Sequence, residues 1–464
     1  MLHPAFLPLM TECLGPEEAG ALCHALTATP APTSIRINPR KLRSAPFDEG
    51  LLRPVPWCTG GFYLKERPTF TLDPRLHAGA YYVQEASSMF LEQAWRTIVA
   101  HGGGRPRRVL DLCAAPGGKS TLWRSLIPDD ALLVANEPIR QRAQILAENL
   151  TKWGHPATVV TSAYPEEFAP FEGFFDIIGA DVPCSGEGMF RKDETARSEW
   201  SPEAVERCAE RQWQIVSDIW PALRPGGWMV YSTCTFNRRE DEEMATRICR
   251  ELGATMVEIP VMPEWGTAGH CHFYPHRAEG EGFFLTLLRK DGGEDWESDG
   301  GTYTAKKGRK GKENRMPAVK NAAQVVKWLD DSDAYRIFRP SEQHIAAIHK
   351  IFADDAARLS SRLRVLTAGV LLAEEKGSKL IPQHALALSD ALAEDAFPRA
   401  ELTLADALAY LRRESITLSS DVPRGYVIVT FDALPLGFVN NLGARANNLY
   451  PDAWKIRIQV PRQA

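Results

Sequence analysis

The sequence lacks the features of a secreted, metal-binding or membrane-spanning protein. Its nine cysteines are an odd number spread over 464 residues, and none forms a C-x-x-C pair, which disfavours a disulfide framework and a structural zinc site. No apolar run approaches the roughly 20 residues of a membrane-spanning helix. The opening residues Met1 to Pro8 carry two prolines and no lysine or arginine, unlike a signal peptide. We therefore expect reduced thiols, a cytoplasmic location, no metal ion and no membrane segment.

An excess of positive charge and two common nucleotide-binding motifs are also missing. Lysine and arginine number 54 against 59 acids, a formal net charge of -5, which argues against a uniformly basic protein that coats nucleic acid but leaves room for a local basic face. Neither G-x-G-x-x-G nor the P-loop pattern occurs, so a nicotinamide dehydrogenase is disfavoured. A chain of 464 residues is too long for one hydrophobic core, which predicts several domains.

Residues 1–75 predict a small α+β unit. Residues 17–27 have helical spacing, and Ile35 and Ile37 alternate with polar neighbours as in a half-buried strand, which places Arg36 on the outer face. A cluster of basic residues in this unit fits a solvated loop at least as well as a phosphate contact. Its members are Arg36, Arg40, Lys41 and Arg43.

Residues 76–290 alternate strand and helix patterns, which predicts an α/β fold with a doubly wound, Rossmann-like parallel sheet. The strand at 107–112 leads into a loop of small residues, and a helix begins at Lys119. Backbone N–H groups at such a helix start favour a carboxylate or a phosphate. The next strand ends at Glu137, about 20 residues further on, where an acid is placed to grip a ribose. This half of the sheet is therefore a candidate nucleotide site.

Two further strands each lead into a cysteine. The apolar run 177–180 ends in Asp181 and, beyond a proline, Cys184; a second run ends in Cys234. Because the carboxyl ends of parallel strands lie at one edge of a sheet, we expect both thiols there. An isolated Asp-x-x-Cys would instead suggest a buried cysteine and a helix cap. The acids at 240–243 are expected to begin the next helix, rather than to bind metal.

These motifs resemble the Nop–Sun family of RNA cytosine carbon-5 methyltransferases. The matching stretches are Asp-Leu-Cys-Ala-Ala-Pro-Gly-Gly-Lys at 111–119, Asp-Val-Pro-Cys-Ser-Gly-Glu-Gly at 181–188 and Ser-Thr-Cys-Thr at 232–235, with Gln-Glu-Ala-Ser-Ser-Met at 84–89 and Gly-Glu-Gly-Phe-Phe at 280–284. The resemblance covers about residues 33–290. Beyond it, residues 385–388 and 435–451 resemble the tail of bacterial members that modify small-subunit ribosomal RNA.

The resemblance implies S-adenosylmethionine as cofactor and different catalytic roles for three residues at the sheet edge. Cys234 would attack carbon 6 of cytosine, Cys184 would assist release, and Asp181 would steady the ring. Chemistry alone would allow the two cysteines to exchange roles. The residues that would contact the cofactor are Cys113, Ala114, Ala115, Pro116, Gly117, Gly118, Lys119, Glu137 and Asp181.

One position departs from the family pattern. Many relatives carry an acid near the end of the strand that follows Glu137, where the adenine is held. This chain reads Thr-Ser-Ala-Tyr at 161–164. We expect the backbone or Ser162 to take that contact.

The carboxyl-terminal half predicts three parts. Residues 291–325 are glycine-rich and basic, which predicts a flexible linker; 326–390 form an accessory domain; and the resemblance makes 391–464 a PUA-like RNA-binding domain, similar to the pseudouridine-synthase-associated type. We expect these parts to supply RNA affinity and site choice, and we expect a chain truncated after Lys290, if soluble, to bind the cofactor normally. The expected partner is RNA, chiefly small-subunit (16S) ribosomal RNA, and the expected state is a monomer.

Other functions fit parts of this pattern. A transfer-RNA cytosine-5 methyltransferase would share every chemical motif. An amino-methyltransferase would need a polar-Pro-Pro-aromatic loop at 181–184. A non-catalytic RNA-binding factor for ribosome assembly would need neither cysteine. The RNA cytosine-5 methyltransferase explains the most residues.

Overall fold

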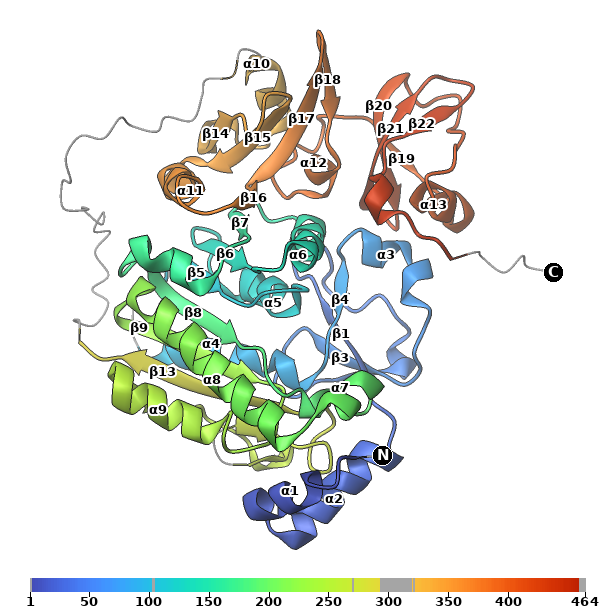
Figure 1. Cartoon of the computed structure of the whole chain (residues 1–464). Helices are drawn as coiled ribbons and strands as arrows, with labels where there is room; N and C mark the ends of the chain where they lie inside the picture. Colours follow the sequence, from blue (N-terminus) through green and yellow to red (C-terminus); the bar gives the residue numbers. More distant parts are fainter. Residues whose placement is uncertain (1, 102–104, 269–270, 293–318, 320–321, 459–464) are drawn as a thin grey trace, which may run out of the picture.

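The computed structural model describes residues 2–101, 105–268, 271–292, 319 and 322–458. Its centre is a large mixed sheet, with two amino-terminal helices at one end of the molecule and the carboxyl-terminal half at the other (Figure 1). Within these residues, no helix combines the length and the apolar character needed to cross a membrane. The molecule is built from four units, which share hydrophobic cores.

The amino-terminal unit has a four-stranded antiparallel sheet in the order β2-β3-β1-β4. Because its last strand is β4, this sheet continues beyond residue 75. Phe6 of the first helix packs with Phe190 and Trp200 of the central α/β unit (residues 84–290), so the two helices are docked there. The elements are α1 (Phe6–Leu14), α2 (Pro16–Ala28), β1 (Thr33–Ile37), β2 (Leu52–Pro54), β3 (Gly61–Leu64), α3 (Pro74–His77) and β4 (Tyr81–Val83).

The expected outward position of Arg36 is wrong. The side chain is 1% exposed; its Nε donates to Gln84 (2.8 Å) and its Nη2 to Thr121 (2.6 Å), while the guanidinium lies over the Trp153 ring. Burial lowers the pKa of Arg36 to about 10. Alternation along β1 identified two faces, but packing of the central α/β unit on the second face buries both.

Two other members of the basic cluster also make internal contacts. Arg40 forms ion pairs with Asp129 and Asp390, and the Lys41 ammonium donates to the carbonyl oxygens of Ala78 (2.7 Å) and Lys152 (2.6 Å). Burial lowers the pKa of Lys41 to about 8. Lys41 is therefore not in a solvated loop, whereas the Arg40 side chain stays 35% exposed; both cations link units of the fold.

The central sheet has the order β11-β12-β13-β9-β8-β5-β6-β7-β16, and β10 also pairs with β13. Strands β7, β6, β5, β8 and β9 are parallel, whereas β13 and β16 are antiparallel to their neighbours. The predicted Rossmann-like core is confirmed. The strands are β5 (Arg108–Asp111), β6 (Leu132–Asn136), β7 (Thr158–Thr161), β8 (Phe175–Asp181), β9 (Leu223–Thr233), β10 (Ala254–Val257), β11 (Thr267–Ala268), β12 (His272–Phe273), β13 (Phe283–Lys290) and β16 (Val365–Ala368).

Helices cover both faces of this sheet. In β8, Ile177 packs with α4, α5 and α6, whereas Ile178 packs with α8 and α9 on the other side. Such double burial explains why these strands read as continuous apolar runs. The helices are α4 (Leu91–Ala100), α5 (Gly118–Leu126), α6 (Arg140–Trp153), α7 (Glu194–Glu199), α8 (Pro202–Ile219) and α9 (Glu242–Leu252).

The accessory unit is continuous with the central sheet. Its strand β16 pairs with β7, for example Val365 with Thr161, and Leu363 shares a buried cluster with Leu110 of β5. The chain after the linker therefore completes the central sheet, and the accessory unit is not structurally independent of that sheet. The other elements are α10 (Ala322–Val325), β14 (Tyr335–Phe338), β15 (His344–His349), α11 (Ala353–Ser360), β17 (Val370–Lys376), β18 (Lys379–Pro382) and α12 (His384–Leu388); β14-β15-β17-β18 form a sheet.

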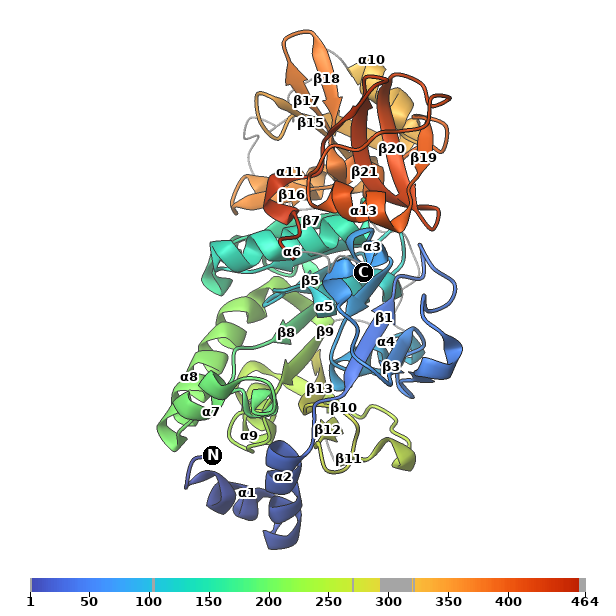
Figure 2. The ribbon, with the colours of Figure 1, turned by 90° about the vertical axis from the view of Figure 1, so that its right-hand side faces the viewer.

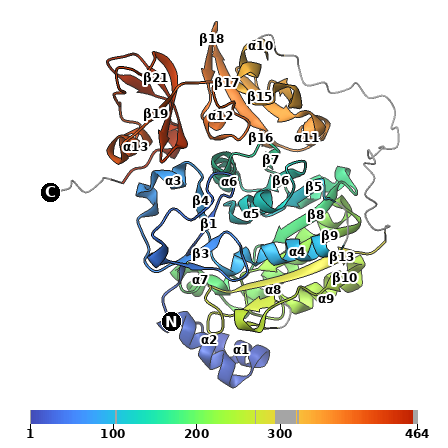
Figure 3. The same ribbon diagram turned by 180° about the vertical axis from the view of Figure 1, so that it is seen from behind.

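The last unit packs against the amino-terminal sheet. Tyr410, Val427 and Tyr450 lie in one cluster with Ile35 and Tyr81, and Figures 2 and 3 show this unit next to α3. The elements are β19 (Arg399–Glu401), α13 (Leu404–Leu411), β20 (Gly425–Phe431), β21 (Leu434–Asn441) and β22 (Ala446–Asn448). Most of the expected linker, residues 293–318 and 320–321, lies outside the described residues.

Candidate active site

The two cysteines lie side by side at the carboxyl ends of β8 and β9. The Sγ atoms of Cys184 and Cys234 are 3.3 Å apart, a contact in which either thiol can be the donor. Parallel pairing of Asp181 with Ser232 sets the two following loops next to each other. The Gly188 N–H donates to the Cys234 carbonyl oxygen (2.8 Å), and a Cβ on Gly188 would lie 2.9 Å from that oxygen, so a glycine is required there.

The environment of Cys184 disfavours its thiolate form. The hydrogen bond with Cys234 and burial raise the pKa of Cys184 well above its ordinary value. Cys184 therefore keeps its proton at neutral pH and can donate it towards Cys234. The contact places the Cys184 thiol directly beside the Cys234 sulfur.

Asp181 lies between the cysteines and the cofactor loop. One carboxylate oxygen accepts from the Lys119 ammonium (2.9 Å) and the other from the Ser232 hydroxyl (2.8 Å). Lys119 also lies 5.1 Å from the centre of the Phe283 ring. The acid and the cation come from different strand–loop units, so their spacing in the sequence does not reveal that they pair.

The loop from Cys113 to Lys119 turns sharply into α5. Gly117 has φ +117°, a left-handed conformation that side chains disfavour, and it caps the helix. Asn149 donates to the Pro116 carbonyl oxygen (2.8 Å), and Arg142 to that of Ala115 (3.1 Å). These bonds from α6 hold the loop through its carbonyl oxygens. The first N–H groups of α5 therefore stay available to an anion.

Two acids mark the strand ends beside this loop. Glu137 follows β6, is 2% exposed, and accepts a hydrogen bond from the Ile139 N–H (3.0 Å). Asp111 ends β5 and accepts one from the Ser120 hydroxyl (2.5 Å); burial raises its pKa to about 7. Cys113 is neutral, because burial and the charge of nearby Asp181 raise its pKa.

Ser162 follows β7, next in line along the edge. Its hydroxyl donates to the Pro138 carbonyl oxygen (3.3 Å) and its N–H to that of Arg364 (2.9 Å). Both groups thus have partners within the chain, and the Ser162 hydroxyl oxygen keeps its capacity to accept.

The expected capping role of the acids at 240–243 is wrong for the first two. Glu240 and Asp241 are fully buried before α9 begins: Glu240 accepts from the Ser185 N–H (3.0 Å), and Asp241 accepts from the Thr233 hydroxyl (2.5 Å). In the described residues, no group of three or more His, Cys, Asp or Glu is arranged to hold a metal ion.

Comparison with known proteins connects this site to one family. The family model for 16S rRNA methyltransferase RsmB/F matches residues 104–289, that for the N-terminal domain of 16S rRNA methyltransferase RsmF matches 2–86, and the methyltransferase RsmF PUA domain matches 397–456. The ribosomal RNA small subunit methyltransferase F of Erwinia tasmaniensis is 32% identical over 474 residues, which cover 97% of this chain and 95% of that protein. The chain belongs to the methyltransferase F family.

Other relatives agree with this family. The methyltransferase F of Salmonella typhi is 32% identical over 449 residues, 91% of this chain and 90% of its own length. Two structures from Pyrococcus horikoshii share the fold: NSun6 with SFG has a TM-score of 0.52 at 19% identity over 62% of this chain and 98% of that one. The second, a methyltransferase homolog protein, has a TM-score of 0.51 at 24% identity, over 62% of this chain and 100% of that one.

Glu187 lies in the motif at 181–188, but neither the motifs nor their spacing revealed which residues hold the two cysteine loops. These are Glu187, Gln212, Asn237 and Glu240, all fully buried, and they are linked to one another by hydrogen bonds. A pair of acids and two amides at these spacings resembles ordinary loop and helix composition. Only their burial and convergence distinguish them.

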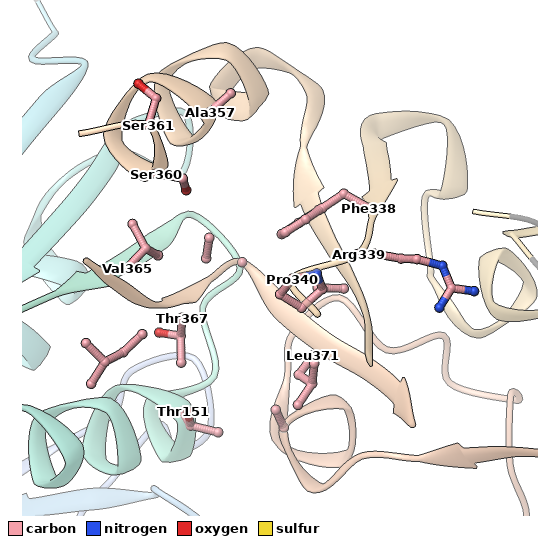
Figure 4. A pocket seen from close by; sticks show the side chains of 15 residues that line it. Thr151, Phe338, Arg339, Pro340, Ala357, Ser360, Ser361, Val365, Thr367 and Leu371 are labelled. Atoms are coloured by element: carbon pink, nitrogen blue, oxygen red, sulfur yellow. The ribbon is translucent and has the colours of Figure 1, made fainter. Parts of the chain in front are cut away.

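A cavity of about 520 Å³ lies between the accessory unit, including β16, and the part of α6 that carries Thr151 (Figure 4). Phe338, Pro340, Ser360, Thr367 and Leu371 are among its 15 lining residues. None of the predicted site residues lines it. The cavity is therefore separate from the candidate active site.

Proposed function

We propose that this protein transfers a methyl group from S-adenosylmethionine to carbon 5 of cytosine in 16S ribosomal RNA, through a covalent bond between Cys234 and carbon 6. The observation that supports this most is the 3.3 Å contact between the two thiols, in which the hydrogen bond with Cys234 and burial raise the pKa of Cys184 and keep it protonated. Carbon 5 of cytosine is a poor nucleophile. Addition of a thiolate to carbon 6 turns it into an enamine carbon, which accepts the methyl group.

The residues at the cofactor edge fit S-adenosylmethionine. The N–H groups at the start of α5 suit its carboxylate, and the first turn of that helix contains no acid. Glu137 stands at the end of β6, where an acid accepts hydrogen bonds from ribose hydroxyls. When bound, the sulfonium supplies the methyl group. The neighbour NSun6 carries SFG, an analogue of this cofactor.

Asp181 and Lys119 act on the ring together. Negative charge develops on the cytosine as the thiolate adds, and a carboxylate alone would repel that charge. The Lys119 ammonium, 2.9 Å from Asp181, supplies the opposite charge, and Asp181 can accept a hydrogen bond from the amino group of the base. The pair therefore orients the base and stabilises the adduct.

Release requires a base. After methylation, carbon 5 still carries its hydrogen; loss of that proton returns the electron pair to the ring and expels the Cys234 thiolate. Cys184 is the thiol in contact with Cys234; once it has released its own proton to solvent, its thiolate can accept the proton from carbon 5, and its raised pKa makes that thiolate a strong base. Since the target base must leave its stack to reach Cys234, unpaired or loosely paired RNA is the preferred substrate.

The test is methylation by the purified full chain. Small-subunit ribosomal RNA, transfer RNA and the assembled subunit are each incubated with S-adenosylmethionine, and the nucleosides are separated by mass spectrometry. We expect 5-methylcytosine in the ribosomal RNA and none in transfer RNA. Methylation of transfer RNA alone would support the other substrate, and RNA binding without any methylation would support an assembly factor.

A further inference from the structure

Two buried acids connect the loops that carry the two cysteines. Glu187 follows Cys184 in the chain, and Glu240 follows Cys234; both side chains are 0% exposed. Each carboxylate bonds to the loop that carries the other cysteine. Buried carboxylates are costly unless they are fully hydrogen-bonded, so such an arrangement needs a structural or functional reason.

Glu187 holds the backbone behind Cys234. Its Oε2 accepts from the Phe236 N–H (2.6 Å) and the Thr235 hydroxyl (2.5 Å), and its Oε1 accepts from the Trp200 indole N–H (3.0 Å) and the Asn237 amide (2.9 Å). Four donors thus surround a carboxylate that the Cys184 loop contributes. The segment that follows Cys234 is anchored to this acid.

Glu240 holds the residues on both sides of Cys184. Its Oε2 accepts from the Ser185 N–H (3.0 Å) and from Gln212 (2.6 Å), and the same Gln212 amide donates to the Pro183 carbonyl oxygen (3.0 Å). Its Oε1 accepts from Asn237 (2.8 Å). Asn237 therefore contacts both acids and links the two halves of the arrangement.

We propose that Glu187 and Glu240 are positioning residues that act crosswise: Glu187 places Cys234 for attack, and Glu240 places Cys184 for release. This proposal rests on the proposed function. Thiols 3.3 Å apart on two separate loops stay in contact only if the loops cannot move independently. Since each acid binds the opposite loop, its loss should impair the cysteine on that opposite loop.

The experiment separates the two steps. Glu240→Gln should form the protein–RNA adduct with S-adenosylmethionine and RNA but release it slowly, so the adduct should accumulate on a denaturing gel. Glu187→Gln should form little adduct and little product. The rate of adduct release in Glu240→Gln and the rate of adduct formation in Glu187→Gln should each fall about tenfold or more, as for a lost hydrogen bond to a charged group. Matched controls are Glu243→Gln and Glu194→Gln, whose exposed side chains lie in the same two segments.

A second measurement needs neither RNA nor cofactor. Diamide oxidises neighbouring thiols to a disulfide and is itself reduced to the hydrazine; mass spectrometry of the linked peptides follows the bond between Cys184 and Cys234. Both glutamine variants should form it more slowly than the wild type. If the wild type makes no 5-methylcytosine but this slowing occurs, the proposed function fails while the positioning stands.

Three results would overturn the positioning role. One is a disulfide rate and an adduct-to-product ratio unchanged in both variants. Another is an equal loss of adduct in both variants with an unchanged disulfide rate, which indicates general instability. The third is accumulation of adduct in Glu187→Gln and not in Glu240→Gln. If a glutamine variant does not fold, Asn237→Ser removes the amide that both acids share and should slow the disulfide in the same way.

Discussion

The backbone N–H of Ser162 donates to the carbonyl oxygen of Arg364 at 2.9 Å. Ser162 directly follows β7, at the position where the adenine is expected, and Arg364 directly precedes β16. The accessory unit thus forms the last strand of the sheet that carries the cofactor site. Its removal would expose the hydrogen-bonding edge of β7.

The accessory unit should therefore stabilise the catalytic core. Leu363 is buried in the cluster that includes Leu110, and Leu363→Ala should destabilise the protein by about 2–5 kcal/mol. Leu404→Ala, at an exposed leucine, is the control in thermal melts. Truncation after Lys290 should leave an insoluble or less stable chain. A truncated protein with the melting temperature and cofactor affinity of the full chain would contradict this.

Glu137 should contribute to cofactor affinity. Glu137→Ala removes a charged acceptor at the end of β6 and should weaken binding of S-adenosylmethionine by about 1.5–3 kcal/mol. Isothermal calorimetry measures this directly. Glu166→Ala, at an exposed acid beyond β7, should bind as the wild type does. Equal affinity of the two variants for S-adenosylmethionine would mean that Glu137 does not contribute to cofactor binding.

The two cysteines should give opposite covalent results. Cys234→Ala removes the nucleophile, so neither 5-methylcytosine nor a protein–RNA adduct should form. Cys184→Ala leaves attack possible and hinders release, so an adduct should accumulate on a denaturing gel. An adduct with Cys234→Ala and none with Cys184→Ala would reverse the roles of the two thiols.

Lys119 should matter for the rate of the reaction. Lys119→Met keeps the length of the side chain and removes the charge beside Asp181, so methylation under saturating cofactor should slow by about 10²-fold. Lys290→Met, at a lysine that donates to Trp220 and Leu223 carbonyl oxygens away from the cysteines, is the control. An unchanged rate in Lys119→Met would mean that the pair has no role in charge stabilisation.

Asp111 should make stability depend on pH. Burial raises its pKa from 3.8 to about 7, so the folded protein binds more protons than the unfolded chain between these values. The stabilisation is complete below pH 3.8 and is lost as the pH rises through 7. Between pH 5.5 and pH 8, the melting temperature of Asp111→Asn should therefore fall less than that of the wild type. Parallel melting curves across this range would contradict the shift.

Sequence patterns predicted the parts of the site that come from single strand–loop units. The loop at 113–119 and the acid Glu137 each follow one strand, and the paired cysteines follow two strands of the same design. Parallel strands place such loops at one edge, so these positions could be placed without coordinates. The partners of Asp181 and the crossed acids Glu187 and Glu240 could not, since they depend on which loops meet.

The sequence by itself determined the order of strands and helices, the sheet edge with both thiols, and the family. Periodicity and motif spacing are local properties, and they carry this information directly. Only the tertiary structure decided that Arg36 is buried, that β16 completes the catalytic sheet, and that Glu240 holds the Cys184 loop. These features arise from packing between segments far apart in the chain. No local pattern encodes which buried surface or which unpaired strand edge another segment will cover.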